Sequence, residues 1–227
     1  MLHTIRSPRL IQLALLLTAV SLVACSKDGE GKGKAEVEET GVDFENNPLS
    51  AMGKLAEVGQ QMQAKQEEMA KRKPVDPLPF GDLIPLLPKV DGWTSTEEAK
   101  GETTQMGEYK ITTVSQSYSR TVGDKTQSMS VTLLDGSYIP MVYAPFLMMS
   151  QFSREGTDGH NKGLTISGQP AFEEWKKEQQ SVNLSILVED RFLVTLNGDN
   201  VAAEEGRTWA GHIKLNQLKE LAQKAAK

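Results

Sequence analysis

Between residues 182 and 196, apolar and polar side chains alternate in two consecutive runs. The apolar positions are Val182, Leu184, Ile186 and Val188 in the first run and Phe192, Val194 and Leu196 in the second. A period of two is typical of a β-strand with one buried face. Glu189, Asp190 and Arg191 are a connection of the length found in tight hairpins, so the pattern predicts two antiparallel strands that need a sheet around them.

The same alternation recurs at residues 109–113, 129–133 and 164–166, and residues 172–177 form a further predicted strand. Helical patterns occur at residues 144–152 and 217–226, and in the second of these Leu218, Leu221, Ala222 and Ala225 share one face. This order predicts an α+β fold with a mainly antiparallel sheet of about six to seven strands and covering helices.

The chain contains a single cysteine, Cys25, at the end of an apolar run that begins after Arg6 and Arg9. A basic start and a short apolar segment are typical of a secretory signal peptide, and the run is shorter than a membrane-spanning helix requires. The stretch "LVAC" at residues 22–25 resembles the lipobox of bacterial lipoproteins. That resemblance implies cleavage of residues 1–24, lipidation of Cys25 and attachment to the membrane, and Ser26 in place of aspartate favours the periplasmic face of the outer membrane.

Residues 25–49 are rich in Gly, Glu and Lys, so we expect them to form a disordered tether. Residues 50–73 are mostly helix formers and predict a stalk helix that ends before Pro74. Its methionine and leucine spacing leaves open a coiled-coil dimer as the alternative to a solvated stalk. A proline-rich entry segment at residues 74–92 then begins the folded domain, residues 74–227.

The sequence carries no recognisable catalytic motif, so we expect a non-enzymatic protein without a cofactor. His160 lies in "GTDGHNKG" and reads as an exposed loop histidine, although Asp158 is close enough in sequence to orient it. No spacing of His, Cys, Asp and Glu indicates a metal site. The formal net charge of −5, with basic and acidic residues interspersed, argues against a nucleic-acid partner.

The stretch "YIPMVYAPFLMMSQF", residues 138–152, crowds aromatic and methionine side chains around two prolines. Such clusters occur both in cores and on adaptable binding surfaces. The candidate interaction residues are Tyr143, Phe146, Leu147, Met148 and Met149. If the proline-rich segment covers the second face of this helix, the cluster is core, and otherwise it is an exposed patch.

Stretches such as "LLP…GW", "YAPF" and "DRFLVT" resemble those of bacterial lipoproteins to which no activity is assigned. The element order also loosely resembles the PsbP-like fold. These resemblances imply a membrane-anchored envelope lipoprotein but no activity. Because no catalytic motif is present, we expect it to act as a binding module for an envelope protein or a small apolar ligand. The alternative is a structural accessory of an envelope assembly that acts through its stalk helix.

Overall fold

The computed structural model describes residues 36–40, 42–43, 57, 59–60, 63–65, 67–69 and 71–225, all within the compact unit Lys32–Lys227. The described strands are β1 (Val37–Glu39), β2 (Val42–Asp43), β3 (Thr94–Ser95), β4 (Lys100–Met106), β5 (Tyr109–Val122), β6 (Lys125–Asp135), β7 (Phe152–Gly156), β8 (Gly159–Ile166), β9 (Gln169–Lys176), β10 (Ser181–Val188) and β11 (Phe192–Asp199). The described helices are α2 (Phe80–Leu83), the 3-10 turn η1 (Ile84–Leu86), α3 (Pro140–Met149), α4 (Glu205–Ala210) and α5 (Leu215–Ala225).

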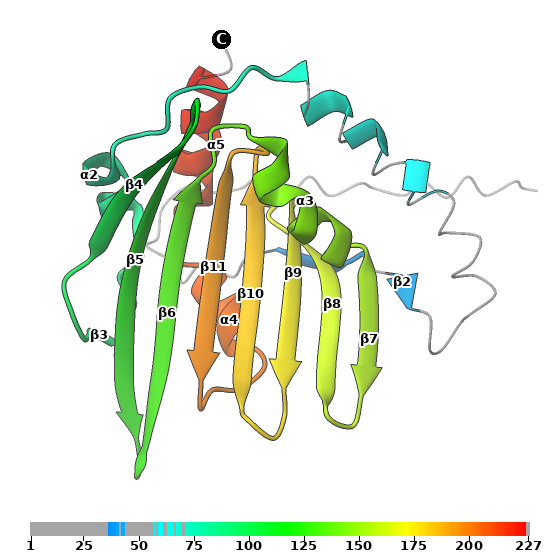
Figure 1. Ribbon diagram of the computed structural model, residues 1–227. Coiled ribbons are helices and arrows are strands. Elements are labelled where there is room, and N and C mark those ends of the chain that lie inside the picture. The colour runs from blue at the N-terminus through cyan, green and yellow to red at the C-terminus, as the bar shows by residue number, and fades with distance from the viewer. Residues whose placement is uncertain are drawn as a thin grey trace, which may run out of the picture. The chain divides into compact units, whose positions relative to one another are not determined.

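The described strands form one 11-stranded sheet in the order β2-β7-β8-β9-β10-β11-β6-β5-β3, with β1 beside β8 and β4 beside β5 (Figure 1). All pairs are antiparallel except β2 with β7. A mainly antiparallel sheet is therefore confirmed, but six to seven strands is wrong, and the described part is mostly β with a few helices. The strands that were not predicted include the edge strand β4, which reads "KGETTQM" and needs no apolar face.

The predicted hairpin at residues 182–196 is confirmed as β10 and β11, which pair from Val182 with Gly198 to Val188 with Phe192. Glu189 and Asp190 have φ angles of 52° and 54°, the left-handed conformation that tight hairpin turns use. Apolar side chains at alternate positions of both strands therefore reach one face of the sheet.

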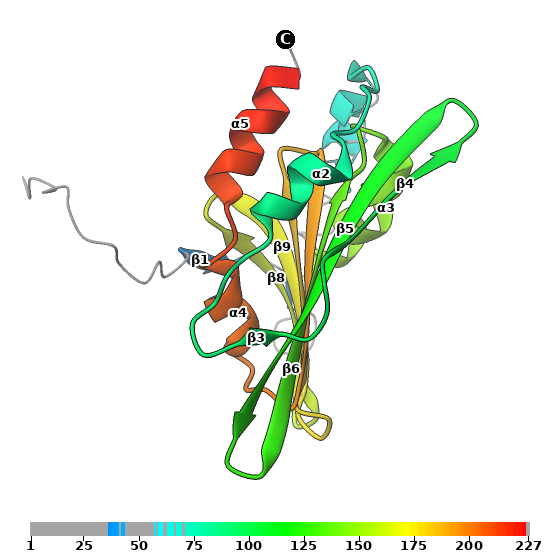
Figure 2. The same ribbon diagram turned by 90° about the vertical axis from the view of Figure 1, so that its left-hand side faces the viewer.

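That face holds the larger hydrophobic core and is covered by α2, α4 and α5 (Figure 2). Trp209 of α4 is fully buried at its centre. Its ring meets those of Trp93 and Tyr118 edge-on, with centroids 5.1 and 4.9 Å apart. The predicted C-terminal helix is confirmed as α5, and Leu218 and Ala222 on its apolar face are buried in this core.

The opposite face carries α3 and a smaller core. This helix begins at Pro140, earlier than the predicted range of 144–152, so Pro145 lies inside the helix instead of in its first turn. Residues after Met149 leave the helix, and β7 starts at Phe152. The short helix α4 was not predicted, because its six residues are fewer than a periodic pattern needs.

The N-terminal predictions change in two places. Strands β1 and β2 belong to the sheet, so a disordered tether is wrong for their residues, whereas residues 25–35, 41 and 44–49 lie outside the described part. Among residues 57–71 the described positions are helical, but Met69 is only 1% exposed and packs in the smaller core. The end of the predicted stalk helix is therefore docked on the sheet and is not a solvated stalk.

Candidate functional site

An open hollow of about 750 Å³ lies on the face of the sheet that α4 covers. Strands β8 and β9 contribute His160, Lys162, Glu173 and Trp175 to its lining. The tip of the β5–β6 hairpin and the loop of residues 200–204 provide further walls. This volume falls within the range of about 300–1,000 Å³ that small-ligand sites usually have.

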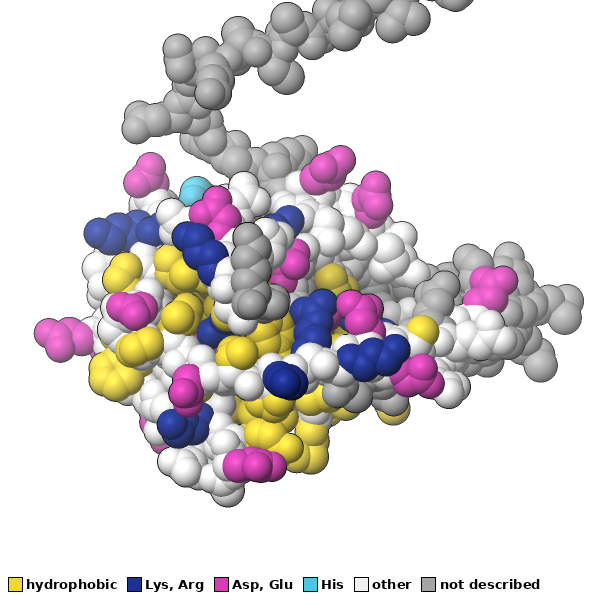
Figure 3. Space-filling view, turned by 90° about the horizontal axis from the view of Figure 1, so that it is seen from above, with side chains coloured by type: hydrophobic (Ala, Val, Ile, Leu, Met, Phe, Trp, Pro, Cys, Tyr) yellow, Lys and Arg dark blue, Asp and Glu magenta, His cyan; other side chains and the backbone are white. Residues whose placement is uncertain are grey.

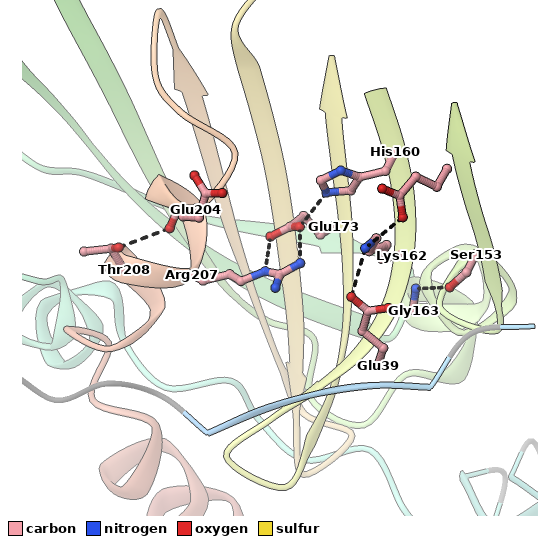
Figure 4. A network of polar contacts seen from close by, with 10 residues as sticks. Glu39, Ser153, His160, Lys162, Gly163, Glu173, Glu204, Arg207 and Thr208 are labelled. Carbon is pink, nitrogen blue, oxygen red and sulfur yellow. Dashed lines mark hydrogen bonds and ion pairs between the residues drawn. The ribbon is translucent and has the colours of Figure 1, made fainter. Parts of the chain in front are cut away.

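Glu173 is the centre of the polar network in this hollow, and its side chain is 0% exposed. The guanidinium of Arg207 donates from Nε to Glu173 Oε2 at 2.9 Å and from Nη2 to Oε1 at 2.7 Å. His160 Nε2 lies 2.8 Å from the same Oε1. Figure 4 shows both side chains directed at the carboxylate from opposite sides, one from α4 and one from β8.

Burial opposes the charged form of Glu173, but hydrogen bonds from His160 and Arg207 outweigh it and hold the pKa of this carboxyl below its ordinary value. The same contact with Glu173 raises the pKa of Arg207. A buried ion pair gains little stability over an apolar pair of the same size, because both charges lose their hydration. The network is therefore poorly explained as a device for stability alone.

Lys162 forms a second pair of contacts at the rim of the hollow. Its Nζ lies 2.9 Å from Glu39 Oε1 on β1 and 3.3 Å from Glu155 Oε2 on β7. The hydrogen bond to Glu39 is the main reason why the pKa of Lys162 is raised. Strand β1 thus brings a carboxylate to the site from the N-terminal side of the domain.

The floor of the hollow is a cross-strand pair of rings, because His160 of β8 lies opposite Trp175 of β9. Their centroids are 5.9 Å apart and their planes are inclined by 32°. Gly159 precedes His160 with φ of 145°, and a Cβ there would collide with the backbone oxygen of Trp175. Only glycine fits this close approach, which fixes where β8 begins and where His160 points.

His160 is therefore not the exposed loop histidine that the sequence suggested. Its side chain is 14% exposed and lies in a strand, and the turn before it is confined to Thr157 and Asp158. Asp158 does not orient the imidazole but pairs with Arg154 at 3.3 Å. Glu173 takes that role, from a position 13 residues further along the chain.

The five candidate interaction residues of α3 divide into two groups. Tyr143, Phe146 and Leu147 are buried, whereas Met148 and Met149 are 56% and 48% exposed. The buried group is covered by Met69 of the N-terminal helical segment. The proline-rich segment does not cover it, because Leu83 packs in the core on the other face of the sheet.

The end of the sheet that lies uppermost in Figure 1 is seen in Figure 3, where apolar side chains gather among charged ones. At this end a second polar cluster surrounds the buried Arg191, whose guanidinium donates to Asp135 at 3.0 and 2.8 Å. Asp135 also accepts from the backbone N–H groups of Ser137 and Leu78. These bonds connect the end of β6, the β10–β11 turn and the proline-rich segment, so the cluster has a structural role.

Cys25, the predicted site of lipidation, lies outside the described residues. No described helix has the length and apolar character that crossing a bilayer takes. Within the described ranges, no three His, Cys, Asp or Glu side chains converge as a metal site requires.

Comparison of the chain with protein-family models, curated proteins and solved structures gave no match.

Proposed function

We propose that this chain is a lipid-anchored binding protein of the bacterial cell envelope, and that the hollow beside Glu173 holds a small polar ligand. The lipobox-like "LVAC" supports the anchor, with the periplasmic face of the outer membrane as the proposed location. The binding function keeps the non-enzymatic class expected from the sequence.

The observation that carries the proposal is a fully buried carboxylate held by a guanidinium and an imidazole at the edge of an open space. A carboxylate that only had to complete a core would cost free energy relative to an apolar side chain. Here Glu173 instead fixes the positions of Arg207 and His160, which both line the hollow. Fixed polar groups converging on a cavity are typical of a ligand site.

The lining also changes the kind of ligand that we propose. An apolar ligand would strip water from charged groups such as Lys162, Glu155 and Arg207 without replacing their hydrogen bonds. A polar ligand replaces them, so it fits this hollow better than the apolar one that the sequence suggested.

The structural-accessory alternative has less support. It requires residues 50–73 to be available to a partner, but Met69 is buried in the smaller core. Lys65 and Arg72 also contact Asp190, at 2.8 and 3.2 Å. A protein partner would instead find exposed Met148 and Met149 on α3.

The test is a ligand screen by NMR on the detergent-solubilised chain, using neutral sugars, amino acids, dicarboxylates and fatty acids as probes. We expect a polar probe to shift the ring signals of His160 and Trp175. The matched variant is Ala203→Phe, because Ala203 lines the hollow and takes no part in the network. The proposal is contradicted if a polar probe binds Ala203→Phe as tightly as it binds the unchanged chain, or if fatty acids are the only probes that bind.

A further inference from the structure

The charges that line the hollow balance one another. Three of the lining residues are cationic and three are anionic, and they are Lys125, Lys162, Arg207, Glu155, Glu173 and Glu204. A site that selects a charged ligand usually presents an excess of the opposite charge, which steers the ligand and compensates for its lost hydration. The lining of this hollow presents no such excess of either sign.

Several polar side-chain atoms that line the hollow have no hydrogen-bond partner within the described part of the chain, and they include both donors and acceptors. Arg207 Nη1 and the Gln127 amide nitrogen make no hydrogen bond within the described part of the chain, since the bonds of these residues use other atoms. The same holds for the carboxylate of Glu204 and for the Asn200 side-chain oxygen, which can only accept. Hydroxyl groups both donate and accept, so a ligand with several of them matches this mixture.

The floor and walls of the hollow also include apolar surface. Trp175 and the His160 ring lie side by side on the sheet, and Val122, Val201 and Ala203 line the walls. An aromatic ring among hydrogen-bonding groups suits a ligand with one apolar face and a polar rim. A pyranose ring has that form, because its C–H bonds gather on one face and its hydroxyls radiate around it.

We infer that the ligand is an uncharged oligosaccharide of two or three rings. This inference rests on the proposed function and adds the chemical class of the ligand. One ring lies against Trp175, and its hydroxyls meet Glu204, Asn200 and Arg207. A volume of about 750 Å³ is larger than a single sugar ring needs.

The experiment measures binding of maltotriose, cellotriose and tri-N-acetylchitotriose by calorimetry at low and high salt. We expect at least one to bind with a Kd that changes by less than about twofold between the two, because no net charge is screened. The charged comparison probes are trigalacturonate and the dipeptide Ala-Ala. Ala203→Phe should weaken saccharide binding at least tenfold.

Substitutions of Glu204 distinguish a neutral ligand from one that carries an ammonium group. For a saccharide, Glu204→Gln should weaken binding by about fivefold or less, because the amide oxygen still accepts a hydrogen bond, and Glu204→Ala should weaken it by about tenfold. For an ammonium ligand, Glu204→Gln and Glu204→Ala should be equally damaging. Glu108→Gln, on the exposed β4–β5 turn, is the matched control and should have no effect.

The outcomes distinguish the two proposals. If Ala-Ala or trigalacturonate binds, Ala203→Phe prevents it and no neutral trisaccharide binds, the saccharide class is wrong while the binding function stands. If none of the five probes binds, the inference is wrong. If a trisaccharide binds Ala203→Phe as well as the unchanged chain, the hollow is not its site and both proposals fail.

Discussion

Replacing Arg207 with alanine tests whether the network around Glu173 has the strength that its geometry implies. Glu173 accepts hydrogen bonds from Arg207 through both oxygens and contacts His160 at one of them. Loss of one partner from a fully buried ion pair costs about 3–5 kcal/mol. Because the Arg207 side chain is 29% exposed, water can enter the vacated space. We therefore expect a loss of about 2–3 kcal/mol in the free energy of unfolding.

The assay is urea unfolding at pH 7 in a Cys25→Ala background, which removes the proposed acylation site. Arg154→Ala is the matched control, because its partner Asp158 is exposed, and it should leave the midpoint nearly unchanged. Adding Glu173→Gln to Arg207→Ala should recover part of the loss, since the uncompensated charge is then gone. The reasoning fails if Arg207→Ala costs no more than Arg154→Ala, or if the second substitution makes the loss larger.

Four further results are expected. Leu147→Ala should cost about 2–5 kcal/mol in urea unfolding, whereas the exposed Met148→Ala should change stability by about 0.5 kcal/mol or less. Met69→Ala should also cost about 2–5 kcal/mol, and no loss would show that the N-terminal segment is not docked. Because the pKa of Glu173 is lowered by folding, its contribution is fully present above the ordinary value of 4.5 and is lost as the pH falls through the folded value. The stability difference between the unchanged chain and Glu173→Gln should therefore shrink in acid. Cys25→Ala should move the protein out of the membrane fraction and abolish its labelling by fatty acid. Lipidation is refuted if the variant stays in the membrane fraction and its fatty-acid labelling is the same as that of the unchanged chain.

The sequence predicted strands correctly where alternating apolar side chains mark a buried face. The alternation from Val182 to Val188 is repeated because every second side chain of β10 enters the same core. The edge strand β4, and β7 beside the two-residue strand β2, show no such alternation, because neither of their faces has to be apolar. The two-residue strands β2 and β3 are too short to show an alternating pattern of apolar and polar side chains.

The candidate site was missed for a different reason. His160, Glu173 and Arg207 are far apart in sequence and meet only through the register of β8 with β9 and the position of α4. The glycines and Asp158 around His160 favoured a loop, although the turn takes only two residues. A signal was present in Glu173, a charged residue inside the predicted strand of residues 172–177, which alternates with Ala171 on the buried side of β9. A carboxylate at such a position requires a partner.

If Cys25 is lipidated as proposed, strand β1 also limits how far this domain can lie from the lipid surface. The sheet already contains Val37, and the backbone of Thr40 donates to Gly163 on β8. With Cys25 as the proposed lipidated residue, only residues 26–35 separate the anchor from Glu36. At no more than about 3.6 Å per residue, that length reaches roughly 40 Å however it is arranged. With that anchor, the β1 edge and Glu39 at the rim of the hollow would stay within about 40 Å of the bilayer, and lengthening residues 26–35 would extend that range without altering the site.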